Sequence, residues 1–135
     1  MRRRAWWSVV VFATALSAGC GAEDATEEAW ESEVRGAAHA FVLRSEGSVR
    51  EGPNAFDLEI EPIDGSALDP AATVSVVVHM RAMTHSEQEV EVRHVEAGSF
   101  SVGDVIFAMP GTWDLEISVE EGASVDRATF ELDVP

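Results

Sequence analysis

The sequence predicts an all-β fold, and three features of the chain indicate it. Apolar and polar residues alternate in short runs, most clearly over 56–60 and 113–119, as in strands with one buried face. Turn signals around Gly65 and Gly111 are among those that separate the runs. Residues 37–135 show no convincing helical period. Together these features favour a single seven-stranded, immunoglobulin-like β-sandwich, preceded by a signal peptide and an acidic linker.

The alternation predicts each strand in chain order. The seven strands cover residues 40–44, 56–60, 73–80, 88–95, 99–107, 113–119 and 128–134. Within the sixth strand, Trp113 and Leu115 are expected in the core, whereas Asp114 and Glu116 are expected on the wet face. No disulfide is available to this domain, so its stability has to come from packing.

Residues 1–19 have the organisation of an export signal. Three arginines precede an apolar stretch, and small residues then lead to Cys20, the only cysteine of the chain. The segment resembles a bacterial lipoprotein signal peptide, in which the cysteine is diacylated and becomes the first mature residue. Ser17 stands where that pattern most often has leucine. Lipidation of Cys20 by two acyl chains predicts stable attachment to a membrane surface.

Two alternatives to lipidation stay open. The segment could be an uncut membrane anchor, although the stretch 5–18 is shorter than the roughly 20 apolar residues that span a bilayer. It could also be an ordinary secretory signal that leaves Cys20 as a free thiol. Under the lipoprotein interpretation, Gly21 favours sorting to the outer membrane, facing the periplasm or the cell surface. The predicted localisation is therefore the cell envelope.

The charge of the chain is strongly acidic. All 25 acidic residues follow Cys20, with six of the nine arginines and no lysine, so the mature chain carries 6 − 25 = −19 with neutral histidines. Such a surface repels phosphate backbones and anionic lipid. The sequence therefore predicts no nucleic-acid partner and membrane attachment through the lipid anchor alone.

An acidic tether is expected between the lipid and the folded domain, over residues 20–36. The stretch 21–36 holds six acidic residues before Arg35 and no sustained apolar period, so it buries too little apolar surface to offset its ordering entropy. Trp30 either docks on the edge of the domain or stays exposed. Residues 37–135 then form one domain of ordinary size.

Methionine and histidine side chains concentrate in one part of the domain. They are Met80, Met83, Met109, His79, His85 and His94. Thioether and imidazole groups suit a soft or borderline metal such as copper. A copper site built from Met80, Met83, His85 and Met109 is geometrically feasible, because these residues fall at strand ends and in one loop. His94 or His79 would serve as a reserve ligand.

Each candidate ligand also has a purely structural interpretation. Met80 ends a valine-rich strand and fits a core position that fills an irregular gap. Met109 fits a position packed under Trp113. His94 is in phase with valines and fits an interior, hydrogen-bonded histidine. His85, in a polar stretch, is expected to be exposed and available.

Four segments of the chain, in order and spacing, resemble the YtkA-like domain. They are 52–56, 80–85, 98–100 and 107–113, and the resemblance covers roughly residues 50–120. That family is related to FixH-type and CopC-like proteins, which are small exported or membrane-attached sandwiches. The resemblance implies a sandwich fold over 37–135 and a link to copper handling. Arg81 departs from the family's usual Met-Pro-x-Met-x-His by replacing the proline.

Other chemistry finds little support in the sequence. Asp64, Asp69 and Asp104 lack the close spacing of a calcium loop, and no glycine-rich phosphate loop or nucleophile signature is present. We therefore expect no enzymatic activity and identify no small-molecule substrate. Two function classes are left. The first is an envelope copper-binding module that supplies or protects a membrane oxidase or transport pump, and the second is a metal-free sandwich that contacts another envelope protein.

Overall fold

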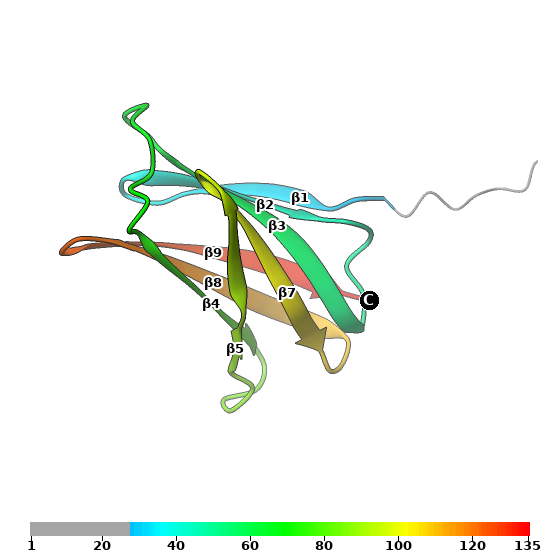
Figure 1. The fold of residues 1–135 in the computed structure, drawn as a ribbon. Coiled ribbons are helices and arrows are strands. Elements are labelled where there is room, and N and C mark those ends of the chain that lie inside the picture. Colours follow the sequence, from blue (N-terminus) through cyan, green and yellow to red (C-terminus); the bar gives the residue numbers. More distant parts are fainter. Residues whose placement is uncertain (1–27) are drawn as a thin grey trace, which may run out of the picture.

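The computed structural model describes residues 28–135, which form two antiparallel β-sheets packed face to face (Figure 1). The predictions for the signal peptide and for Cys20 lie outside the described residues. Residues 28–135 contain no helix, and so none that could span a membrane. Their strands are β1 Glu31–Arg35, β2 His39–Ser45, β3 Gly52–Pro62, β4 Thr73–Met80, β5 Gln88–Val90, β6 Val92–Glu96, β7 Ser99–Phe107, β8 Gly111–Glu121 and β9 Ser124–Val134.

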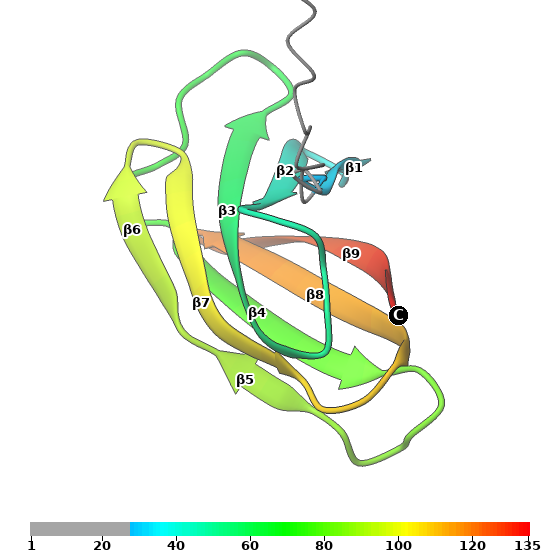
Figure 2. The ribbon, with the colours of Figure 1, turned by 90° about the vertical axis from the view of Figure 1, so that its right-hand side faces the viewer.

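The two sheets share the strands unequally. One sheet has five strands in the order β1-β2-β3-β7-β6, and the other has four in the order β5-β4-β8-β9. All neighbouring strands are antiparallel. β5 and β6 follow one another along one side of the sandwich, yet they belong to different sheets (Figure 2). The all-β sandwich that the sequence predicts is confirmed.

The predicted number of strands is wrong for two reasons. β1 lies inside the segment that was expected to be a flexible tether, so Glu31–Arg35 is strand and not linker. The single strand predicted over 88–95 divides at Glu91 into β5 and β6. The described residues therefore form nine strands instead of seven. β4 and β7 keep the predicted bounds of 73–80 and 99–107.

Trp30 docks on the domain and fixes the start of β1. Its backbone N–H donates to Ser45 Oγ at 2.9 Å, and its carbonyl accepts from the Ser45 N–H at 2.8 Å. The indole ring meets Phe56 and Phe130 edge-on, with ring centroids 6.2 and 6.4 Å apart. Because Phe56 and Phe130 belong to opposite sheets, Trp30 bridges the two layers at one edge.

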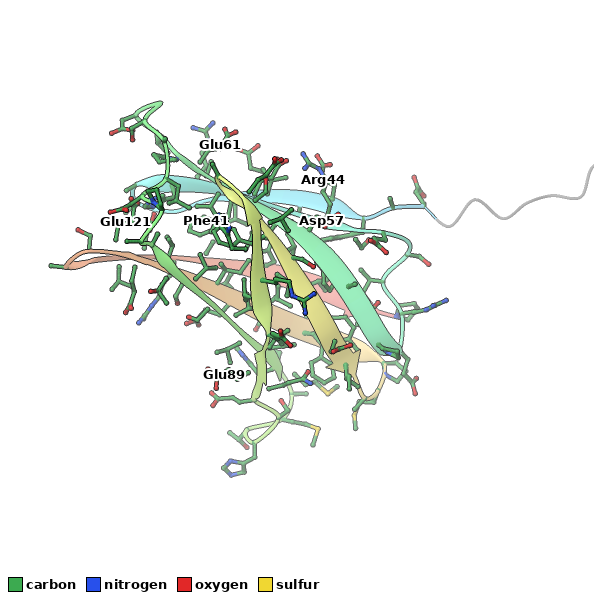
Figure 3. The ribbon with its side chains drawn as sticks, viewed as in Figure 1. Phe41, Arg44, Asp57, Glu61, Glu89 and Glu121 are labelled. Atoms are coloured by element: carbon green, nitrogen blue, oxygen red, sulfur yellow. The ribbon has the colours of Figure 1, made fainter. Side chains whose placement is uncertain are left out.

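The core lies between the sheets and follows the strand alternation. Phe41 and Leu58 from one sheet are fully buried with Leu115 and Phe130 from the other. Phe41 points into the space between the sheets in Figure 3. Trp113 and Leu115 are buried as predicted. Asp114 was predicted to lie on the solvent-exposed face, and this prediction is wrong, because the residue is only 7% exposed.

Candidate metal centre

Three methionines gather at one end of the sandwich. Met80 ends β4, Met83 lies in the β4–β5 loop and Met109 lies in the β7–β8 loop. β4 and β8 pair in a register that places Met80 opposite Trp113, so the two loops leave the same end of the sheet. The sulfur atoms drawn in Figure 3 all lie at this end. We call Met80, Met83 and Met109 the methionine rim.

Met80 is the buried member of the rim. It is 9% exposed and continues the inward face of Val76 and Val78. Its terminal methyl packs on Gly111, where an added Cβ would lie only 2.6 Å from Met80 Cε. The structural interpretation of Met80 as a core residue is therefore confirmed.

Met83 and His85 are presented to solvent by a short loop. Met83 is 47% exposed, and His85 is exposed as predicted. The Met83 N–H donates to the Met80 carbonyl at 3.0 Å. Ser86 Oγ accepts from the Met80 N–H at 2.7 Å and lies 3.3 Å from the Met83 carbonyl. These contacts fold the loop back on the end of β4.

Met109 is held through its backbone and leaves its side chain accessible. The Trp113 indole N–H donates to the Met109 carbonyl at 3.1 Å, and the indole packs on Phe107 with centroids 5.3 Å apart. Met109 itself is 40% exposed. Met109 is therefore not a buried residue beneath Trp113, and the contact that the structure shows between the two residues is made by the Met109 backbone.

His94 does not reach the rim. It is exposed on β6, with its ring edge-on to Phe100 at 5.5 Å, so the interior interpretation is also wrong. It borders a cavity of about 120 Å³ beside Ala72, which precedes β4, whereas Met80 ends that strand. At about 3.3 Å per residue, His94 lies roughly 25 Å from the rim. His94 is thereby removed from the candidate ligand set.

His79 faces away from Met80 and meets a carboxylate. Successive side chains of a strand point to opposite faces, so His79 lies on the outer side of the four-stranded sheet. Its Nε2 is 3.5 Å from Asp114 Oδ2. Neither reserve ligand thus joins the rim.

An arginine–carboxylate group beside the rim was not predicted from the sequence. The Arg81 guanidinium donates to both oxygens of Asp114, at 3.1 and 2.6 Å, and lies 2.6 Å from Glu131 Oε2. The hydrogen bonds to Asp114, and then those to Glu131, raise the pKa of Arg81 above its usual range, so the group stays charged. Alternation correctly points Asp114 outward, but the long side chain of Arg81, in the loop after the neighbouring strand β4, covers it. The alternation of apolar and polar residues cannot predict that one side chain covers another in this way.

The donor set of the rim is chemically soft. Among residues 28–135, no group of three or more His, Cys, Asp or Glu side chains could hold a metal ion. A site at the rim would therefore depend on thioether sulfur, supplemented by the imidazole of His85. Thioether ligands select Cu(I) over harder ions such as Ca²⁺ or Mg²⁺.

The fold and the rim together define a small β-sandwich with a methionine-bearing end. The sequence model of the YtkA-like family matches residues 37–118, more than half of the chain, and the chain belongs to this family. The resemblance drawn from the sequence is thereby confirmed. No curated protein and no solved structure matches the chain.

Proposed function

We propose that the protein is a lipid-anchored, copper-binding module of the cell envelope. The observation that supports the proposal is the gathering of Met80, Met83 and Met109 at one end, with the imidazole of His85 in the same loop as Met83. Two of the thioethers are accessible to an incoming ion, and the third extends from the core. Membership of the YtkA-like family is consistent with a role in envelope metal handling.

Cu(I) is the form that this donor set suits best. Thioether sulfur is a soft ligand, and it is available to an exported protein that has no free thiol for the purpose. The excess of acidic residues, 25 against nine arginines, also favours the approach of a cation over that of an anion. The module would deliver copper to, or withhold it from, a membrane oxidase or a transport pump, and the proposal assigns it no catalytic step.

A competition titration tests the copper proposal directly. The full chain is titrated with Cu(I) against a chromogenic chelator, alongside Met83→Leu, Met109→Leu and His85→Asn. We expect each of these variants to bind Cu(I) more weakly than the wild type. His94→Asn is the matched control, because this exposed histidine lies far from the rim, and its affinity should equal that of the wild type. Equal, weak binding by all the proteins would end the copper proposal.

A second candidate function is a metal-free interaction module that contacts another envelope protein. Ile106, which is 49% exposed, is held close to β5, because its N–H donates to the side-chain oxygen of Gln88 at 3.2 Å. This isoleucine adds apolar surface to the exposed Met83 and Met109. The strand order β2-β3-β7-β6 against β5-β4-β8-β9 supports the immunoglobulin-like assignment, and such sandwiches often act by display of a surface.

Cross-linking in cells separates the two functions. A photoreactive group at position 106 would capture a partner equally with and without copper if the interaction module is correct. Capture that requires copper, or no capture together with Cu(I) binding in the titration, favours the copper module.

A further inference from the structure

Arg81 joins the loop that carries Met83 and His85 to both strands of the neighbouring β8–β9 hairpin. Its backbone N–H donates to the Thr112 carbonyl at 3.1 Å, and its guanidinium binds Asp114 and Glu131. Thr112 and Asp114 belong to β8, whereas Glu131 belongs to β9. We propose that Arg81 is a positioning residue that sets the geometry of the methionine rim. This inference rests on the proposed copper function.

The Arg81–Asp114 pair differs from an ordinary surface ion pair. The Asp114 side chain is only 10% exposed, whereas the Arg81 side chain is 52% exposed. Exposed ion pairs contribute little, but a carboxylate that is largely removed from water strongly requires its partner. Two parallel N–H···O contacts also fix the orientation of the guanidinium. Asp114 therefore holds Arg81 in one position.

The same stretch of β8 also controls the other loop of the rim. Thr112 and Asp114, which bind Arg81, flank Trp113, whose indole N–H holds the Met109 carbonyl. Residues 112–114 thus anchor the loop of Met83 on one side and the loop of Met109 on the other. The separation of the two exposed thioethers depends on this shared anchor.

The charge of Arg81 does not oppose copper binding. Asp114 and Glu131 both lie within 2.6 Å of its guanidinium nitrogen, so its positive charge is compensated by two carboxylates. His79 is a further titratable group at this site, with Nε2 3.5 Å from Asp114. Guanidinium is not itself a metal ligand, and Arg81 acts only through the loop that it holds.

The Arg81→Lys variant distinguishes the positioning role of Arg81 from its positive charge. It keeps the positive charge, but its compact ammonium group does not reproduce the planar two-point contact with Asp114. We expect Arg81→Lys to weaken Cu(I) binding by about 10–100-fold. This is the typical effect of losing a group that orients metal ligands. Asp114→Asn, which removes the partner charge, should weaken binding in the same way.

The control is an arginine pair of similar form on the other sheet. Arg44 bridges Glu31 and Glu59 at 2.5 and 3.0 Å on the outer side of the five-stranded sheet (Figure 3). Arg44→Lys should leave the Cu(I) affinity unchanged. An equal loss in Arg44→Lys and Arg81→Lys would mean that both act on general stability, and it would overturn the proposal.

A metal-free measurement keeps this inference separate from the copper proposal. Amide hydrogen exchange of Met83 and Arg81, in the full chain without copper, reports the order of the loop. We expect both amides to exchange faster in Arg81→Lys than in the wild type, with amides of β7 unchanged. Wild-type exchange in Arg81→Lys would refute the positioning role even if copper binds. Failure of the wild type to bind Cu(I), with faster exchange in the variant, would refute the copper function alone and leave Arg81 as the residue that orders the loop.

Discussion

The imidazole Nδ1 of His39 lies 3.0 Å from Asp126 Oδ2, and the same carboxylate binds the turn that precedes β2. Asp126 accepts the N–H groups of Ala37, Ala38 and His39 at 2.8–2.9 Å. On its other side, the imidazole hydrogen-bonds through Nε2 to Glu121. A neutral imidazole has one N–H, so hydrogen bonds to two carboxylates require the charged form. This group ties the β1–β2 turn to the β8–β9 hairpin at the end opposite the rim.

The stability of the protein should depend on the protonation of His39. Burial lowers the pKa of His39, but the hydrogen bonds to Asp126 and Glu121 outweigh it and raise the pKa above its ordinary 6.5. Asp64 is a further acidic group close enough to interact with it. Because the folded pKa is the higher one, the stabilisation is fully present below the unfolded value and is lost as the pH rises through the folded value.

Urea unfolding of the wild type and of His39→Asn, from pH 5 to pH 9, measures this dependence. The difference in unfolding free energy should be largest at the acidic end and should shrink as the pH increases. Two curves that run parallel across the whole range would contradict the prediction.

Gly111→Ala should destabilise the protein by about 1–3 kcal/mol. The backbone at Gly111 has φ +142°, a conformation that L-residues rarely adopt, and the new Cβ would meet Met80 Cε at 2.6 Å. Gly103→Ala is the matched control, since nothing lies within 4 Å of its added Cβ. Thermal unfolding of the two variants should show a loss confined to position 111, and equal melting temperatures would be incompatible with the crowding of Met80.

Met83 and Met109 should be oxidised before Met80 by dilute hydrogen peroxide. They are 47% and 40% exposed, compared with 9% for Met80, and oxidation of methionine to the sulfoxide follows accessibility. Peptide mass spectrometry at short reaction times gives the order. Oxidation of Met80 at the rate of the other two would show that the rim opens in solution.

Trp30→Ala should cost about 2 kcal/mol, less than the roughly 3–5 kcal/mol of a fully buried aromatic residue, because Trp30 is only partly buried. The loss removes the edge contacts with Phe56 and Phe130 and weakens the attachment of β1. Ile63→Ala, at an exposed position, should change the unfolding free energy by less than about 0.5 kcal/mol. A Trp30 variant as stable as the Ile63 variant would mean that β1 adds nothing to the fold.

Period-two alternation predicted the strands that bury one face throughout. β4 has its predicted bounds, because one face is packed on the core along its length, and β7 has them although its alternation changes phase between Val102 and Val105. β1 was not predicted, because its exposed residues are all charged and its inward residues, Ser32 and Val34, are only half-buried. Its pairing with β2 is a tertiary contact that local composition does not reveal.

Some features of the candidate site could likewise be predicted from the sequence, and others could not. Strand ends and loop positions placed Met80, Met83 and Met109 at the same end of the sandwich, since antiparallel pairing fixes which strand ends meet. His94 was misplaced, because the change of sheet at Glu91 breaks the phase that links it to Val90. The burial of Asp114 was not predicted, because the Arg81 side chain that covers it comes from the loop after β4.

If Cys20 is lipidated as proposed, the start of the folded domain near β1 limits its distance from the membrane. The segment from Cys20 to Glu28, where the described residues begin, can span at most about 30 Å. Under the proposed lipidation, this short segment keeps the sandwich close to the surface of the bilayer. A copper donor or acceptor would have to come to that surface, which favours integral membrane proteins over freely diffusing ones.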